Sequence, residues 1–182
     1  MKELSLNILD IAENSVSAKA SLIEIAIMES VAQNFLEIKI TDNGCGMSEE
    51  FLKTVADPFS TTRKTRKVGL GISLLKLATE QSEGKFEIRS TLGKGTVVVA
   101  LFKHDHIDRP PLGDIGQTIS TLVSCNLDID FIYTHNFEGN TFKFSTKEVV
   151  ETIPDVPLNT PDVVLWIQDY INEGITDISL KM

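Results

Sequence analysis

Four polar side chains near the start of the sequence are spaced three, four and three residues apart: Asn7, Asp10, Asn14 and Ser17. In a helix, which turns by about 100° per residue, this spacing places all four on one face. Such a stripe can simply be the solvated face of an amphipathic helix. Because Asp and Asn oxygens suit Mg²⁺, the stripe is also a candidate magnesium site.

A second candidate site follows an alternating apolar run that ends at Ile40. Gly44 and Gly46, spaced by one residue at the end of a strand, allow the backbone to approach a flat ligand closely. Asp42 adds a carboxylate, the acceptor needed for an exocyclic amino group such as that of adenine. The alternative is a turn without a ligand, since Asp-Asn-Gly is ordinary turn chemistry.

A third candidate site combines positive charge with glycine. Four cations lie between Arg63 and Lys67, and the glycines of Val68–Ile72 then open a helix. Unpaired N–H groups and the helix dipole at such a start favour an anion. The sequence is not a Walker loop, because the Gly-Lys-Ser/Thr ending is absent. The alternative is a solvated, mobile basic loop.

Alternating and helical apolar patterns predict the elements that position these sites. Helices are predicted over 3–18, 71–83, 112–125 and from 160 to a stop at Gly174, and strands over 22–28, 35–40, 85–90, 96–102, 128–134 and 141–145.

The net charge of -9 is confined to the second part of the 182-residue chain. Residues 1–103 hold 13 acids and 13 Lys or Arg, whereas residues 104–182 hold 13 acids and four bases. This shift predicts a linker over 104–111 and a small acidic α/β module over 112–182. An acidic surface makes nucleic acid an unfavourable partner. Two cysteines, no signal peptide and no apolar span predict a cytoplasmic protein without a membrane segment.

The combination of motifs resembles a known superfamily, the ATPases of gyrase, MutL, histidine kinases and anti-sigma-factor kinases. Four motifs occur in the order of that family: Glu13–Ala20, Asp42–Met47, Phe59–Thr62 with Val68–Leu75, and Gly93–Thr96. The resemblance covers residues 6–103 and implies the Bergerat ATP-binding fold. This fold is an α+β, two-layer sandwich whose mixed sheet carries helices on one face, so we expect it for residues 1–103.

The resemblance also implies cofactors and residue roles. ATP and Mg²⁺ are the expected ligands, with Asn14 binding the metal, Asp42 accepting the adenine amino group and Thr96 helping to hold the base. The other nucleotide-binding positions fall in the glycine boxes and the lid: Gly44, Gly46 and Met47 near the base, and Lys64, Gly69, Leu70 and Gly71 near the phosphates. Asp10 is the candidate catalytic base, although gyrase-type members place the longer glutamate at that position.

A regulator that phosphorylates or switches a separate protein is the function that this resemblance favours. A complete histidine kinase presents an acceptor histidine on a helical segment before its ATP domain, and no such segment precedes Asn14 in this sequence. His106 is a linker residue by our interpretation, because Pro110 and Pro111 follow it. The alternatives are a non-catalytic ATP-binding module and a dimerising ATPase. The acidic module is the expected partner or dimer surface, and residues 61–67 are expected to be mobile until a nucleotide binds.

Overall fold

A computed structural model describes residues 3–55 and 70–181. Its six strands form one sheet in the order β3-β4-β2-β1-β5-β6. All neighbouring strands are antiparallel except β1 and β5, which run parallel. The strands are β1 (Leu22–Ser30), β2 (Phe35–Asp42), β3 (Lys85–Thr91), β4 (Gly95–Lys103), β5 (Asp130–Phe137) and β6 (Asn140–Ser145).

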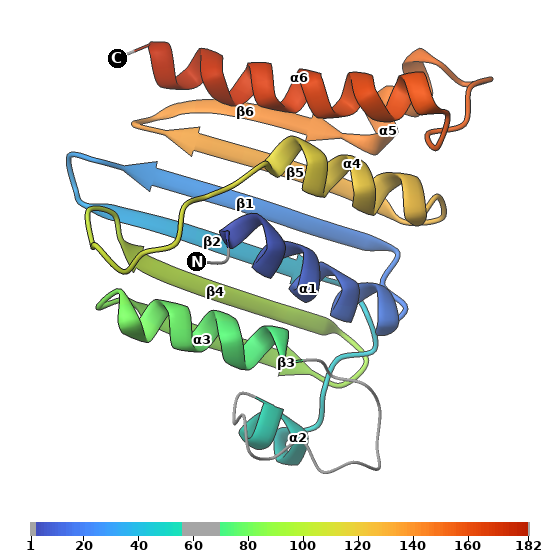
Figure 1. The fold of residues 1–182 in the computed structure, drawn as a ribbon. Coiled ribbons are helices and arrows are strands. Elements are labelled where there is room, and N and C mark those ends of the chain that lie inside the picture. The colour runs from blue at the N-terminus through green and yellow to red at the C-terminus, as the bar shows by residue number, and fades with distance from the viewer. Residues whose placement is uncertain (1–2, 56–69, 182) are drawn as a thin grey trace.

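The long helices form a second layer on one face of this sheet. Figure 1 shows α3, α1, α4 and α6 side by side in that order, while two short helices lie at the periphery. The helices are α1 (Leu4–Ser17), α2 (Glu49–Val55), α3 (Gly71–Gln81), α4 (Ile115–Cys125), α5 (Thr146–Thr152) and α6 (Pro161–Leu180). The predicted α+β fold with a mixed sheet and helices on one face is therefore confirmed.

The alternation of side chains along the strands explains why only one face is covered. In β1, Ile23, Ile25 and Ile27 are buried against the helices, whereas Glu24 and Met28 point to the opposite, exposed face. Successive side chains of a strand point to opposite faces, so this pattern suits an antiparallel sheet with one solvated side.

The C-terminal elements continue the same sheet and core. β5 pairs along β1 from Leu22 to Glu29, and α4 and α6 pack beside α1. One hydrophobic core runs through both parts of the chain and includes Ile25 of β1 and Ile167 of α6. The predicted boundary over 104–111 marks a change of charge, and that division stays a prediction.

The segment between β4 and α4 contacts the start of α1 through backbone hydrogen bonds near the C-terminal end of the segment. The N–H groups of Leu4 and Ser5, at the start of α1, donate to the carbonyls of Pro111 (2.9 Å) and Leu112 (2.8 Å). The first N–H groups of a helix have no partner within the helix. This segment therefore supplies the acceptors that the N-terminus of α1 needs.

The end of the last helix differs from the prediction. α6 continues through Gly174 to Leu180, so the predicted stop at Gly174 is wrong. A Cβ on Gly174 would lie 2.2 Å from the ring of Phe142, which shows why a residue without a side chain occupies this position. This glycine allows a close approach to β6, whereas the sequence pattern alone indicates a helix end.

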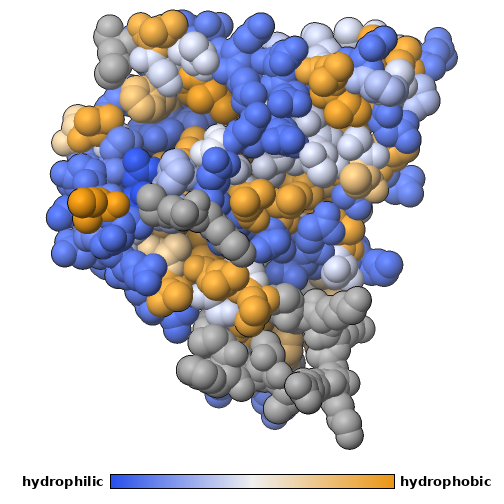
Figure 2. All heavy atoms as spheres, in the orientation of Figure 1, coloured by the Kyte–Doolittle hydropathy of each residue, from blue (hydrophilic) through white to orange (hydrophobic). Residues whose placement is uncertain are grey.

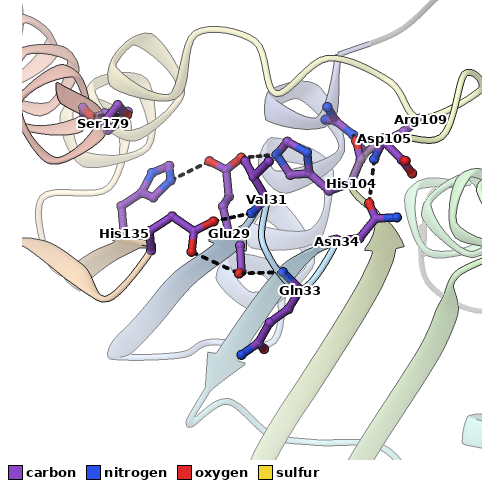
Figure 3. Close-up of polar contacts among 12 residues, drawn as sticks. Glu29, Val31, Gln33, Asn34, His104, Asp105, Arg109, His135 and Ser179 are labelled. Atoms are coloured by element: carbon purple, nitrogen blue, oxygen red, sulfur yellow. Dashed lines mark hydrogen bonds and ion pairs between the residues drawn. The ribbon is translucent and has the colours of Figure 1, made fainter. Parts of the chain in front are cut away.

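A partly buried polar network joins β1 to β5 and to the segment after β4. Figure 3 shows Glu29 between His135 and His104, with its carboxylate 2.7 Å from the first Nε2 and 3.3 Å from the second. The Tyr133 hydroxyl lies 2.7 Å from the other ring nitrogen of His135. Burial alone would raise the pKa of Glu29, but the hydrogen bonds and charges of the two histidines hold it below its ordinary value.

Candidate nucleotide-binding site

Asp42, the last residue of β2, carries a carboxylate that the protein holds in place from two sides. The Ser15 hydroxyl donates to Oδ2 at 2.7 Å, and the Gly44 N–H donates to Oδ1 at 2.8 Å. The side chain is 9% exposed. A carboxylate has about four acceptor positions, so two remain for a ligand. The arrangement therefore presents an oriented acceptor.

Thr96 lies directly opposite Asp42 in the pairing of β2 with β4. Its hydroxyl is 2.9 Å from that of Ser90, which is 2.9 Å from the carbonyl of Gly95. The same Ser90 hydroxyl accepts the N–H of Met47 at 2.8 Å. One serine thus connects the residues expected to hold the base, Met47 and Thr96, across the end of the sheet.

The glycines of this site are required first by the protein's own backbone. Gly46 has φ +65°, and a Cβ there would lie 2.1 Å from the carbonyl oxygen of Thr91. A Cβ on Gly44 would lie 2.8 Å from the carbonyl oxygen of Ala18, and one on Gly95 would lie 1.9 Å from that of Asp42. These close approaches bring the turn after β2 against α1 and β4, which positions the Asp42 carboxylate.

The start of α3 lies against α1 beside the predicted catalytic base. A Cβ on Gly71 would lie 2.8 Å from the Cβ of Asp10, so glycine permits this contact. Asp10 is exposed, and so is Leu70, which precedes the helix. The structure therefore brings Asp10, Leu70 and Gly71 together where a helix N-terminus can face an anion.

Asn14 stands one turn further along α1 from Asp10 and has an unusual environment. Among the described residues, its Nδ2 is the one buried side-chain nitrogen or oxygen without a hydrogen-bond partner. A buried polar atom left unpaired costs about 1–3 kcal/mol. Because the amide nitrogen and oxygen can exchange places by rotation, this side chain can meet either a phosphate oxygen or a metal ion.

The donor set around Asn14 is compatible with Mg²⁺ held mainly by a nucleotide. Within residues 3–55 and 70–181, no three His, Cys, Asp or Glu side chains converge into a metal site. Mg²⁺ in phosphate sites is commonly bound by one or two protein oxygens together with phosphates and water. The unsatisfied amide of Asn14 fits that role.

Two predicted phosphate contacts, Lys64 and Gly69, lie outside the described residues, as does the lid over 61–67. Two residues of the site were missed by the sequence reasoning, Ser15 and Ser90. Ser15 follows Ile8, Ile11 and Ala12 on the buried face of α1. A hydroxyl on an apolar helix face requires a polar partner, and that signal could have identified it.

The fold and this arrangement of residues define a nucleotide-binding domain of the type that the motifs indicate. A family model described as "Histidine kinase-, DNA gyrase B-, and HSP90-like ATPase" matches residues 1–106. Since the match covers more than half of the chain, the protein belongs to this family. It carries an ATP-binding domain of histidine-kinase type, which is consistent with kinase or ATPase activity.

Curated relatives share this part of the chain. The "Putative sensor protein" of Shewanella frigidimarina (strain NCIMB 400) is 36% identical over 103 residues, which are 56% of this chain and 15% of that protein. "Sporulation kinase E" of Bacillus subtilis (strain 168) is 33% identical over 98 residues, which are 53% of this chain and 13% of that protein. The chain therefore spans only a small part of the length of these relatives.

A solved structure supports the fold alone. The chain resembles the structure titled "Crystal Structure of N terminal domain of a DNA repair protein" with a TM-score of 0.57 and 18% identity. The likeness covers 80% of this chain and 53% of that one. None of the helices that the structure describes has both the length and the apolar character of a membrane span.

Proposed function

We propose that the protein binds ATP with Mg²⁺ at the end of β2 and acts on a separate protein partner, by phosphoryl transfer or by nucleotide-dependent switching. The observation that carries this proposal is the Asp42 carboxylate, held by Ser15 and Gly44 with acceptor positions to spare. It faces the adenine amino group in this proposal, with Thr96 beside it and the base against the turn of Gly44, Gly46 and Met47.

The phosphates then extend toward α1 and the start of α3. Asn14 holds Mg²⁺, which when bound neutralises charge on the phosphate oxygens. The N–H groups at Gly71 face the phosphates, and Asp10 is placed to accept a proton from an attacking hydroxyl or water. Its exposure leaves room for an acceptor side chain that belongs to another protein. Lys64 and Gly69 complete the phosphate contacts in this proposal.

Binding selectivity tests the assignment of Asp42. Guanine presents a carbonyl where adenine presents its amino group, so two acceptors would face each other unpaired. We expect ATP and ADP to bind and GTP to bind at least about tenfold more weakly in calorimetry. Asp42→Asn should weaken ATP binding about 10- to 100-fold. Asp105→Asn removes the same charge from an exposed position and should leave affinity unchanged. Equal affinities for ATP and GTP would refute the proposal.

Transfer is tested with ATP labelled at the terminal phosphate. The purified protein alone should acquire no stable label, because phosphoryl transfer requires an acceptor held in line with the terminal phosphate. A native extract should supply a labelled acceptor, and Asp10→Asn should abolish that label while ATP binding persists. Binding without any turnover would indicate a non-catalytic module. ATP-dependent dimerisation with hydrolysis would indicate the dimerising ATPase.

A further inference from the structure

A groove lies at the free edge of the sheet, far from the nucleotide site. It has a volume of about 490 Å³ and is bounded by β6, α5 and α6. β6 is the last strand in the sheet order, and β1 and β5 separate it from β2. Three steps between neighbouring strands correspond to about 15 Å. The groove is therefore a second site, and its volume lies in the range of pockets that bind ligands.

The floor of the groove is apolar and one wall is aromatic. Phe144, Val149 and Val163 line it and are each less than 10% exposed. Trp166 and Tyr170 line it from α6, with ring centroids 5.1 Å apart and planes inclined by 14°. These stacked rings are 48% and 41% exposed. Figure 2 shows hydrophobic groups among hydrophilic ones over α6. Exposed apolar surface bordered by polar groups is typical of interaction sites.

The charge around the groove is negative. Glu148 and Asp162 line it, and its one lining cation, Lys143, lies 3.9 Å from Glu148. Residues 143–173 hold six acids and two bases, and the second base, Lys147, pairs with Asp130 at 3.2 Å. A local excess of acids repels anions and attracts cations. An anionic occupant such as a nucleotide is therefore disfavoured.

The residue spacing along α6 places aromatic rings and a carboxylate on the same side of the helix. Asp162, Trp166 and Tyr170 are four residues apart, so they form one stripe along the helix and face the groove together. A cation over the face of Trp or Tyr is attracted by the ring, and the effect is strongest for Trp. Lys and Arg also carry long aliphatic stems that pack on apolar surface. The stripe thus suits a basic side chain attached to an apolar segment.

We propose that this groove docks a basic, amphipathic segment of the partner protein on which the nucleotide domain acts. The apolar side chains of the docked segment occupy the floor formed by Phe144 and Val149. The Lys or Arg side chains of the segment lie between the aromatic wall and the carboxylates of Glu148 and Asp162. The proposal rests on the proposed function for the identity of the partner, and on the groove for the chemistry of the segment.

Trp166 is the single tryptophan of the chain, so its fluorescence reports on this groove. The probe is a 12-residue Lys/Leu peptide without tryptophan, blocked at both ends, with Leu at helical spacing. Titration into the full chain should change the Trp166 emission saturably. The same peptide with Glu in place of Lys should cause no saturable change. Added salt should weaken binding, because charges at the rim are screened.

One variant tests the negative charge of the groove, and another tests whether the peptide occupies the groove itself. The double variant Glu148→Gln with Asp162→Asn should bind the Lys/Leu peptide about three- to tenfold more weakly. Asp128→Asn with Asp177→Asn changes the net charge equally at residues outside the groove lining and should change affinity less than twofold. Thr152→Phe fills the groove without altering charge and should abolish the fluorescence change, while circular dichroism confirms that the variant folds.

Several results would overturn the proposal. The Lys/Leu peptide could show no saturable binding, the Glu/Leu peptide could bind equally well, or the two charge variants could change the affinity equally; each of these results contradicts the proposal. Self-association of the chain that Thr152→Phe abolishes would identify a second copy as the occupant instead. ATP calorimetry on the same samples separates the two proposals. Intact ATP binding without peptide binding removes only the groove assignment, whereas peptide binding without ATP binding removes only the nucleotide proposal.

Discussion

The region that carries the motifs and the region that follows it differ in chemistry but share one core. Residues up to Lys103 contain the glycine turns, the held carboxylate of Asp42 and the unpaired amide of Asn14. The later region contains an acidic surface and an aromatic groove. Yet β5 lies along β1, and the buried side chains of both regions form one cluster. The family model matches residues 1–106, which share the chemistry of the family. The limits of this match do not by themselves define a folding unit.

The largest expected effect comes from separating the two regions. Deletion of the residues after Lys103 would remove the β5 partner of β1, the core side chains of the later region such as Ile119 and Ile167, and the acceptors of the α1 N-terminus. Burial of one such side chain contributes about 1.5–3 kcal/mol, and total stabilities are about 5–15 kcal/mol. We therefore expect the shortened chain to lose cooperative thermal unfolding and to aggregate. A sharp transition at the full-length temperature would show that residues 1–103 fold independently.

The glycine turns of the first region offer the next largest effect. Gly46→Ala places a Cβ 2.1 Å from the Thr91 carbonyl at a positive φ. We expect a loss of about 3 kcal/mol or more, with weakened ATP binding. Gly93 is the matched control, because it also has a positive φ but a Cβ there meets nothing within 4 Å. Gly93→Ala should cost only the conformational penalty of about 1–2 kcal/mol. Equal losses of stability in chemical denaturation would contradict the close-approach argument.

The extent to which the sequence predicts the structure also differs between the two regions. In the first, periodicity locates every described element except α2, and the motifs bring Asp42, Thr96 and Met47 to one end of the sheet. In the second, periodicity locates the elements except the short helix α5, but it does not reveal that β5 runs parallel to β1. A parallel pair distant in the sequence leaves no local turn signal. The apolar groove likewise depends on tertiary packing of three elements.

Single residues illustrate the same limit. Gly174 has the ordinary signature of a helix end, but the ring of Phe142 requires glycine there. Ser15 carries a local signal, a hydroxyl on an apolar helix face, but its partner Asp42 and the Met47 partner of Ser90 lie far away in the sequence. His135 pairs with Glu29 across 106 positions, and nothing in their spacing indicates it. Local sequence patterns therefore do not predict contacts between segments that are distant in the sequence.

The polar network of Glu29 tests the junction between the two regions. Glu29→Gln should lower the free energy of unfolding by about 1–3 kcal/mol at pH 7. Since the folded pKa of Glu29 is depressed, its stabilisation is present above the unfolded pKa and is lost as the pH falls through the folded one. The difference between wild type and variant should therefore shrink below about pH 4.

The groups that face Glu29 are His135 and His104, while Tyr133 lies behind His135. Burial, and after it the charge of Glu29, raises the pKa of Tyr133. The control is Glu24→Gln on the exposed face of the same strand, which should change stability by less than about 0.5 kcal/mol. Denaturant unfolding from pH 7 to pH 3.5 measures both variants. A constant difference over this range would show that the carboxylate charge of Glu29 does not strengthen the junction.

The smallest expected effect concerns the ligand chemistry of the first region alone. Asn14→Ala removes the one buried side-chain polar atom that lacks a partner among the described residues. The cost to stability should be small, or even a gain, because no hydrogen bond within the described part is lost. ATP affinity should fall about tenfold with Mg²⁺ and much less in EDTA, since the proposed role is that of a metal ligand. Gln117→Ala, which removes an exposed amide side chain from another helix, α4, should change neither value. Calorimetry of the three proteins under both conditions measures the difference. Equal losses with and without Mg²⁺ would assign Asn14 to a direct phosphate contact and would confine the metal to the nucleotide.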